Sequence, residues 1–371
     1  MTDRTFCLDA RTVHPHFPGI GRYAANLART LPARLGPSEH LVILRNPHSP
    51  LWPALGSEDS RVQVVDVPLS PLSVRQHWAL PHVLRQLGVS VYHSPYYLMP
   101  ARPGVRTVVT LHDLIPLHAP RWFTPTQRLM YRLATYLAVH VAQRIVVVSA
   151  TVAQDVTCRL RIPAQRIDII HEAADPLFRP QSEAAVAAVR QRLRLPPRYV
   201  LYVGSNKPHK NLVRLVEAWA HLRPQGTALV IAGSWDTRFP EARRRVAALG
   251  IGDKVLFLGP VAEDDLPGLY CGAIHFVFPS ECEGFGLPVL EAMACGVPVA
   301  CSTAPSLVEI AGDAAVHFGA HDVPGMADAI ASLLGDADAR ADLSQRGAMR
   351  AAQFSWEAAA RSTMAVYRAL T

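Results

Sequence analysis

The chain has 371 residues, of which 50% are hydrophobic and 18% are charged. This composition is typical of a globular protein and excludes collagen-like, coiled-coil and low-complexity chains. At roughly 150 residues per domain, the length predicts two domains. The longest uncharged run near the C-terminus, 292–308, is interrupted by glycine and proline. We therefore expect no helix of the ~20 apolar residues that crossing a bilayer requires.

The net charge of +7 comes from 37 basic and 30 acidic residues. A basic balance suits anionic partners such as phosphates, but the sequence contains no long basic run and no recognisable nucleic-acid module, so we do not expect a nucleic-acid partner. Only three of the basic residues are lysines, namely Lys207, Lys210 and Lys254. Two of them lie close together, which marks their segment as a candidate phosphate site.

The sequence also carries expectations about compartment. Residues 1–5 include an acid and precede an apolar run too short for a secretory signal, which predicts a cytoplasmic protein. The six cysteines form no C-x-x-C pair. We interpret them as reduced core residues.

Short β-branched runs alternate with helical patterns along the whole chain. Most of these runs are continuously apolar, as in strands that are buried on both faces of a parallel sheet. The alternation predicts a doubly wound α/β fold. The predicted strands are 5–8, 41–44, 62–67, 89–93, 107–112, 145–149, 167–171, 199–204, 228–232, 254–258, 274–278, 297–301 and 315–318, and the clearest helices are 22–35, 127–143, 212–222 and 289–294.

A domain boundary is predicted between residues 171 and 199, where four prolines flank a short helical segment. We predict an N-terminal Rossmann-like domain (1–175), a linker (176–198) and a C-terminal Rossmann-like domain (199–354). Residues 355–371 are predicted to form a closing helix with Ser355 as its N-cap.

Residues 279–296 form the segment richest in chemically competent side chains. They follow a predicted strand, turn at the glycines of 284–286 and have Pro288 where a helix should begin. Backbone N–H groups at such a helix start form an anion site suited to a diphosphate. Glu283 and Glu291 bracket this site, where carboxylates would bind hydroxyls rather than phosphate oxygens. The alternative is that Glu283 is a solvated loop residue and Glu291 a surface residue of the helix.

Residues 202–212 form a second strand–turn–helix segment, which contains Lys207, His209 and Lys210. An ammonium group at a helix entrance can neutralise a phosphate leaving group. We identify Lys210 as the candidate cation and leave Lys207 and His209 open. The alternative for either lysine is a solvated loop charge.

Two segments of the first half complete the set. His112 and Asp113 end an apolar strand, where the carboxyl end of a parallel strand would face an interdomain crevice. We predict a functional His112, whereas Asp113 caps the next turn. Gly19 and Gly21 follow the first strand but lack the third glycine of a dinucleotide fingerprint and an acid at the ribose position. We interpret them as a turn that lets backbone approach a ligand held by the other domain.

Together these segments resemble the retaining glycosyltransferases of family 4, which have the GT-B fold. The E-x7-E signature appears as Glu283 to Glu291 within E-G-F-G-L-P-V-L-E-A-M-A, the G-x-x-x-P-x-K-N phrase appears at 204–211, and H-D-L-I-P at 112–116 is similar to a mannosyltransferase-type subgroup. The resemblance covers nearly the full chain. It implies two Rossmann-like domains that face each other across a cleft, the second holding a nucleotide-sugar and the first an acceptor.

The resemblance also implies a role for each candidate residue. The catalytic set would be His112 near the anomeric carbon, Lys210 on the donor diphosphate and Glu283 on the sugar hydroxyls. Glu291 would bind the ribose. The family's second phosphate cation is an arginine, and its position reads Ser205 or His209 here, so we expect Lys207 to replace it. The remaining donor contacts would be Gly19, Gly21, Leu258 at the base, and the backbone of Gly284, Phe285, Gly286 and Leu287.

The expected chemistry follows from the bond that breaks. Cleavage at a nucleoside diphosphate passes through an oxocarbenium-like state and leaves charge on the diphosphate. A lysine and a helix N-terminus can stabilise that charge without a metal, so we expect no required Mg²⁺ and no cofactor. The acidic run 263–265 is interpreted as a helix cap rather than a metal site. Retention of the anomeric configuration is implied by the resemblance.

The sequence thus predicts a retaining glycosyltransferase in polysaccharide synthesis that uses GDP-mannose, or else a UDP-sugar, and a saccharide or lipid-linked acceptor. An epimerase would need acid–base carboxylates at the sugar, and the motif around Glu283 fits that enzyme less well. A dehydrogenase would need a complete glycine fingerprint, which is absent. Intact His112, Lys210, Glu283 and Glu291 argue against a non-catalytic sugar-nucleotide-binding scaffold.

Residues 121–133 combine arginines with aromatic and apolar side chains. Such a helix face could lie on anionic lipid at the inner face of a membrane and meet a lipid-linked acceptor. The alternative is an ordinary helix with its apolar face in the core and its arginines in solvent.

Overall fold

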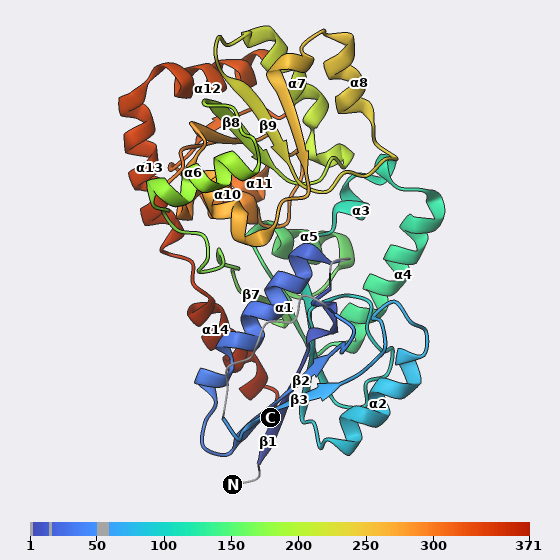
Figure 1. Ribbon diagram of the computed structural model, residues 1–371. Helices are drawn as coiled ribbons and strands as arrows, with labels where there is room; N and C mark the ends of the chain where they lie inside the picture. The colour runs from blue at the N-terminus through green and yellow to red at the C-terminus, as the bar shows by residue number, and fades with distance from the viewer. Residues whose placement is uncertain (1–2, 15–16, 50–58) are drawn as a thin grey trace. The chain divides into compact units, whose positions relative to one another are not determined.

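The computed structural model describes residues 3–14, 17–49 and 59–371, and it divides into two compact units (Figure 1). Unit 1 comprises Met1–Glu172 and Ser355–Thr371, and unit 2 comprises Ala173–Phe354. Each unit is a parallel sheet with helices on both faces. The predicted doubly wound α/β fold is confirmed.

Unit 1 is built on a seven-stranded sheet in the order β3-β2-β1-β4-β5-β6-β7. The chain moves outward from β1 in one direction and from β4 in the other, so the topological switch point lies between β1 and β4. The strands are β1 (Arg4–Asp9), β2 (Glu39–Arg45), β3 (Val62–Asp66), β4 (Val91–Ser94), β5 (Arg106–Leu111), β6 (Arg144–Val147) and β7 (Ile167–Ile169).

The helices of unit 1 include one from the end of the chain. The α-helices are α1 (Pro18–Thr30), α2 (Gln76–Gln86), α3 (Ile115–His118), α4 (Pro125–Val141), α5 (Ala150–Leu160) and α14 (Trp356–Arg368), and the 3-10 turns are η1 (Ala10–Thr12), η2 (Pro32–Arg34), η3 (Pro120–Trp122) and η4 (Ala164–Arg166). The closing helix α14 packs against α1, and the Tyr367 hydroxyl lies 2.7 Å from Nδ1 of His93 in β4. Ser355 Oγ accepts a hydrogen bond from the Ala358 N–H at 3.1 Å, which confirms the predicted N-cap.

Unit 2 is built on a six-stranded sheet in the order β10-β9-β8-β11-β12-β13, with its switch point between β8 and β11. The strands are β8 (Tyr199–Val203), β9 (Ala228–Ala232), β10 (Val255–Gly259), β11 (His275–Phe278), β12 (Val299–Ser302) and β13 (Val316–Phe318). The helices are α6 (Glu183–Arg192), α7 (Leu212–Leu222), α8 (Glu241–Ala248), α9 (Leu266–Cys271), α10 (Leu287–Ala294), α11 (Pro305–Ala311), α12 (Val323–Gly335) and α13 (Ala337–Ala351), with 3-10 turns η5 (Pro208–Lys210), η6 (Gly252–Lys254) and η7 (Glu263–Asp265).

Every predicted strand is found in the structure. The apolar runs of the central strands are buried on both sides of their sheets, whereas the outer strands β3, β7 and β10 are only partly buried. The side chains of Tyr199, Val200, Leu201 and Tyr202 in β8, for example, are fully buried. Burial of this kind is the main favourable term in folding, at about 25 cal/mol per Å² of apolar surface.

The segment 176–198 differs from a plain linker. It contains α6, which packs against α9 and belongs to unit 2. Gly268 of α9 permits this contact, since a Cβ there would lie 2.6 Å from the Val189 side chain.

The cysteines agree only in part with the predicted reduced core residues. None of the six cysteines forms a disulfide with another described cysteine. Cys7, Cys295 and Cys301 are buried, but Cys158 is exposed and Cys271 and Cys282 are half-buried.

Candidate active site

Two loops of unit 2 meet at the switch point of its sheet, where the strand order reverses. One follows β8 and carries Lys210; the other follows β11 and carries Glu283. The two strands are parallel neighbours, so both loops leave the carboxyl edge of the sheet. The Glu281 N–H donates to the His209 carbonyl at 2.8 Å and joins the loops directly. Ligands of doubly wound sheets bind at this kind of position.

Lys210 and Glu283 form an ion pair at the centre of this edge. Lys210 Nζ lies 2.6 Å from Glu283 Oε1, and the two side chains are only 16% and 10% exposed. Ser280 Oγ donates to the same carboxylate oxygen, and the ammonium lies 5.2 Å from the ring centre of Phe278. An ammonium group has three donors, so the pair leaves Lys210 capacity for phosphate oxygens.

Asn211 holds the surrounding loops together. Its backbone is left-handed, with φ of 61°, a conformation that asparagine tolerates better than most residues. Its amide donates to the carbonyls of Pro279, at 3.0 Å, and Ala320, at 2.6 Å. One buried side chain therefore fixes the loops that follow β8, β11 and β13. The sequence shows Asn211 in a motif but gives no signal for these partners.

The helix after the Glu283 loop begins as predicted. Gly286 is the N-cap of α10 with φ of 111°, and Pro288 lies in the first turn. This positive φ strains any other residue, and a Cβ at Gly286 would also force the Leu307 side chain, 2.5 Å away, to shift. The first N–H groups of a helix lack partners within it and carry partial positive charge, which suits an anion. Phe285 packs its ring against Phe354 and offers only its backbone to a ligand.

Glu291 lies inside α10 and is 2% exposed. The Tyr270 hydroxyl donates to its Oε2 at 3.0 Å. The surface-residue alternative for Glu291 is therefore wrong. A buried carboxylate is costly unless it is paired, so a further hydrogen-bonding partner such as a ribose hydroxyl is chemically reasonable here.

The three candidates for the predicted second phosphate cation differ in burial and in charge. His209 is 7% exposed, and burial, followed by the charges of Lys210 and Lys207, lowers its pKa well below the usual value. It is therefore neutral at physiological pH, and Ser205 carries no charge. Lys207 is exposed, and its ammonium makes no hydrogen bond or ion pair with the described residues.

Leu258 lies in β10, the outermost strand of the sheet. Strand β9 lies between β10 and β8, the strand that leads into the Lys210 loop. The turn at the end of β10 is fixed by a hydrogen bond from the Gly233 N–H to the Gly259 carbonyl at 2.8 Å. A Cβ at Gly233 would lie 2.2 Å from the Gly204 carbonyl oxygen. The backbones of these two residues therefore approach so closely that only glycine fits at position 233.

In unit 1, His112 follows β5 and is held from two sides. Its Nδ1 lies 2.9 Å from Glu172 Oε1 and its Nε2 lies 3.1 Å from the Pro95 carbonyl oxygen. The sequence analysis did not identify Glu172 as a site residue, although Glu172 follows a strand just as His112 does. Asp113 Oδ1 accepts from the Ile115 N–H at 2.9 Å, which confirms the predicted turn cap.

Gly19 and Gly21 do not form a turn before the helix, so that prediction is wrong. They lie in the first turn of α1, which begins at Pro18 because proline fits the first helical position. A Cβ at Gly21 would lie 2.8 Å from the Thr12 carbonyl oxygen, whereas nothing lies within 4 Å of one at Gly19. Gly21 is thus explained by helix packing.

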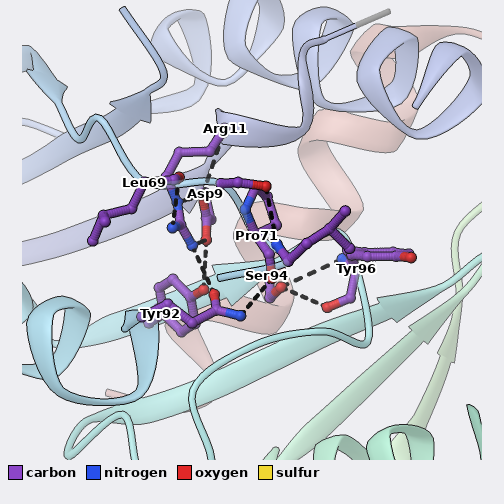
Figure 2. Close-up of polar contacts among 10 residues, drawn as sticks. Asp9, Arg11, Leu69, Pro71, Tyr92, Ser94 and Tyr96 are labelled. Atoms are coloured by element: carbon purple, nitrogen blue, oxygen red, sulfur yellow. Dashed lines mark hydrogen bonds and ion pairs between the residues drawn. The ribbon is translucent and has the colours of Figure 1, made fainter. Parts of the chain in front are cut away.

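A buried ion pair lies at the carboxyl end of β1 in unit 1 (Figure 2). Arg11 is fully buried and pairs with Asp9 at 2.6 Å, and the Tyr92 hydroxyl donates to the same carboxylate at 2.7 Å. Burial alone would raise the pKa of Asp9, but the Arg11 charge and hydrogen bonds outweigh it and lower that pKa. Figure 2 also shows Ser94 Oγ, which donates to the Tyr96 carbonyl at 2.7 Å and fixes the turn that presents Pro95.

The acidic run 263–265 has a structural role that differs from the predicted cap. It forms η7 before α9, and Asp265 binds Arg192 of α6, with Nε 3.1 Å from Oδ2. Its side chain does not cap the helix. Across the described parts of the chain, no three His, Cys, Asp or Glu side chains gather as a metal site would require. None of the described helices has the length and apolar composition to cross a membrane.

Two family models together match most of the chain. "Glycosyltransferase Family 4" matches residues 18–176, and "Glycosyl transferases group 1" matches residues 187–350. Among curated proteins, the O-antigen chain mannosyltransferase B of Escherichia coli is 34% identical over 305 residues, which are 80% of this chain and 77% of that protein.

Solved structures are similar over the whole length. Sucrose-phosphate synthase from Thermosynechococcus elongatus aligns with a TM-score of 0.76 at 24% identity, covering 99% of both chains. HepE from Anabaena, solved in complex with UDP and glucose, aligns with a TM-score of 0.76 at 20% identity, again over 99% of both chains. At these identities the likeness concerns the fold.

Proposed function

The chain belongs to the group 1 glycosyl transferases of glycosyltransferase family 4, and on that premise we propose that it transfers mannose from GDP-mannose to a saccharide or lipid-linked acceptor in polysaccharide synthesis. It is an enzyme of the transferase class with the GT-B fold. The observation that carries the proposal is the Lys210–Glu283 pair beside the start of α10, at the switch point of unit 2.

This edge of unit 2 suits the two halves of a nucleotide-sugar. Lys210, Lys207 and the N-terminus of α10 would bind the diphosphate, because all three present positive charge or N–H donors. Glu283 would accept hydrogen bonds from sugar hydroxyls. Glu291, deeper in α10, would bind the ribose, and Leu258 would lie under the base.

The proposed reaction uses these groups to stabilise the leaving diphosphate. As the glycosidic bond breaks, negative charge grows on the phosphate oxygens, where a preorganised ammonium stabilises the transition state more than the ground state. Lys210 and the helix start supply this charge without a metal. We propose transfer with retention of the anomeric configuration, and His112 of unit 1 near the reacting carbon.

The identity of the donor rests on one relative and one sequence motif. The Escherichia coli relative is named a mannosyltransferase, and the H-D-L-I-P phrase points the same way. HepE is solved with UDP and glucose, which makes a UDP-sugar the second candidate.

Calorimetric titration with GDP and UDP separates the two donors. We expect GDP to bind at least about 10-fold more tightly, a difference of ~1.4 kcal/mol. Tighter binding of UDP would assign a UDP-sugar, and binding of neither nucleotide would contradict the nucleotide site itself.

We also propose that unit 1 contacts an anionic membrane through α4. One face of this helix, with Tyr131, Thr135, Ala138 and Val139, is buried. The opposite face is apolar and 48–64% exposed, and it consists of Leu129, Met130, Leu133, Tyr136 and Leu137. Exposed apolar patches of this kind mark interaction surfaces.

The charge of this region supports an anionic lipid surface as the proposed partner of this face. Between Asp66 and Asp155 the chain has one carboxylate, Asp113, against eight arginines. Exposed Arg121, Arg128 and Arg132 are within or just before α4. Apolar burial together with attraction to anionic headgroups is the usual basis of interfacial binding.

Vesicle sedimentation tests the contact. We expect the protein to bind phosphatidylglycerol vesicles but not pure phosphatidylcholine vesicles. The double variant Leu129→Gln, Leu133→Gln should bind at least about 10-fold more weakly, since two partly exposed leucines lose their apolar burial. Met349→Gln, a similarly exposed apolar site on α13 of unit 2, is the control. Unchanged binding of the double variant would refute the contact, and a dimer that this variant dissociates would assign the face to a second copy.

A further inference from the structure

Both ring nitrogens of His112 face oxygen atoms that only accept hydrogen bonds. Nδ1 lies 2.9 Å from the Glu172 carboxylate and Nε2 lies 3.1 Å from the Pro95 carbonyl. A neutral imidazole has one N–H and one bare nitrogen, so it can satisfy only one of these acceptors. Both contacts are hydrogen bonds only when the ring carries two protons and a positive charge.

The surroundings favour that charged ring. Glu172 is 4% exposed, and a carboxylate so far from water needs a charged or hydrogen-bonded partner. His112 lies beside it and is itself only 16% exposed. The pair therefore supplies the counter-charge that each member requires.

Three other described groups lie near the His112 ring, from α1, from β4 and beside it in the chain. From α1, Tyr23 places the edge of its ring 4.8 Å from the His112 ring, and its hydroxyl contacts Thr110. From β4, burial and then the charge of His112 lower the pKa of His93 to about 3, so His93 is neutral. Asp113 uses Oδ1 in its turn.

The Pro95 carbonyl lies in a turn that is closed by hydrogen bonds. The turn that presents its carbonyl is closed by Ser94 and Tyr96, as Figure 2 shows. The loops that follow β4 and β7 thus hold the His112 ring from opposite nitrogens, while β5 carries its backbone. These two contacts fix the orientation of the ring.

We propose that Glu172 is a positioning residue that keeps His112 a protonated hydrogen-bond donor, so that His112 does not act as a general base. The inference rests on the proposed function of His112 near the sugar. A doubly protonated ring cannot take a proton from the acceptor hydroxyl, whereas it can donate to a sugar or phosphate oxygen. The carboxylate of Glu172 stabilises this form by its adjacent opposite charge.

The kinetic test uses Glu172→Gln, which keeps the shape of the side chain and removes its charge. The rate of mannosyl transfer is measured from about pH 6 to about pH 9. We expect kcat at neutral pH to fall at least about 10-fold, with the KM for the donor nearly unchanged. The pH profile of kcat should differ from that of the unaltered protein, because the ring loses the opposite charge beside it.

Two controls separate positioning from stability. Glu39→Gln removes another buried carboxylate of unit 1, which pairs with Arg368 at 2.7 Å, and should leave the pH profile unchanged. In a His112→Gln background, Glu172→Gln should cause no further loss of kcat, because residues that act as a unit are not additive. Additive losses, or a profile unmoved by Glu172→Gln, would overturn the proposal.

A spectroscopic measurement is independent of turnover. In ¹⁵N-histidine-labelled protein, the ring signal absent from His112→Gln should show two protonated nitrogens at neutral pH, and Glu172→Gln should abolish that state. A singly protonated His112 ring in the unaltered protein would refute the inference even if transfer is found. Absence of mannosyl transfer with a doubly protonated ring would instead count against the proposed function alone.

Discussion

Lys210→Ala should reduce kcat for mannosyl transfer by about 10²- to 10³-fold, the usual loss when one preorganised group that stabilises developing negative charge is removed. Lys210 is the ammonium held beside Glu283 at the switch point of unit 2. Its removal also leaves the mostly buried Glu283 carboxylate without its cation, which should weaken binding of an anionic donor further. The measurement is steady-state kinetics together with calorimetric titration of the nucleoside diphosphate.

The chain offers a matched control for this change. Lys254 is the one lysine outside the candidate site. It lies in η6 immediately before β10, at the amino end of that strand, whereas the candidate site lies at the carboxyl ends of the strands. Lys254→Ala should leave kcat and nucleotide affinity within about 2-fold of the unaltered protein. Equal losses in the two variants would show that the effect of Lys210 is not local to the site. A Lys210→Ala enzyme with full kcat would contradict its assignment to the diphosphate.

The second large effect is expected at Glu291. If its buried carboxylate binds the ribose, Glu291→Gln should weaken nucleotide binding by about 10- to 100-fold, which corresponds to the 1.5–3 kcal/mol of a hydrogen bond to a charged group. The unaltered protein should lose a similar factor when a 2′-deoxy or 3′-deoxy nucleotide replaces the normal one. Glu291→Gln should discriminate much less between these nucleotides.

Tyr270→Phe provides the control for a purely structural role of Glu291. It removes the hydrogen bond to Oε2 but keeps the carboxylate. We expect it to lower the melting temperature while ribose discrimination persists. If Glu291→Gln retains full discrimination and loses only stability, as Tyr270→Phe does, the ribose assignment fails.

The strands and the two donor loops could be predicted because their signals are local. A run such as residues 199–203 is apolar throughout, and that pattern alone predicts a strand buried in a parallel sheet. The loops were found because glycine, proline and a charged residue follow each strand within a few positions. That Lys210 and Glu283 are in direct contact, 73 residues apart, depends on the pairing of β8 with β11 and appears only in the structure.

The partners of His112 could not be predicted for the same reason. Glu172 is 60 residues away along the chain and follows the short strand β7. The ion pair of Asp9 and Arg11 carries no motif, and its burial depends on Tyr92 and on segments that converge in three dimensions. Charged residues are usually exposed, so sequence alone assigns such a pair to the surface.

The errors at the two helix starts have different causes. Gly19 and Gly21 were interpreted as a turn because glycines that follow a first strand resemble those of a nucleotide-binding turn. In the structure, Pro18 starts α1 and the glycines occupy its first turn. The acidic run 263–265 was expected to cap a helix, but the carboxylate of Asp265 binds Arg192 instead. At α1 a local signal, Pro18, was overlooked, whereas at Asp265 a tertiary contact outweighed the local propensity.

The account is tested most directly by incubating the protein with GDP-mannose and UDP-, ADP- and dTDP-sugars, with a saccharide acceptor panel, in the presence and absence of EDTA. NMR of the product reads the anomeric configuration. The account predicts release of GDP from GDP-mannose that persists in EDTA, and an α-mannosyl product from the α-configured donor. Transfer that EDTA abolishes, or a product of inverted configuration, would contradict the proposed metal-free retaining mechanism.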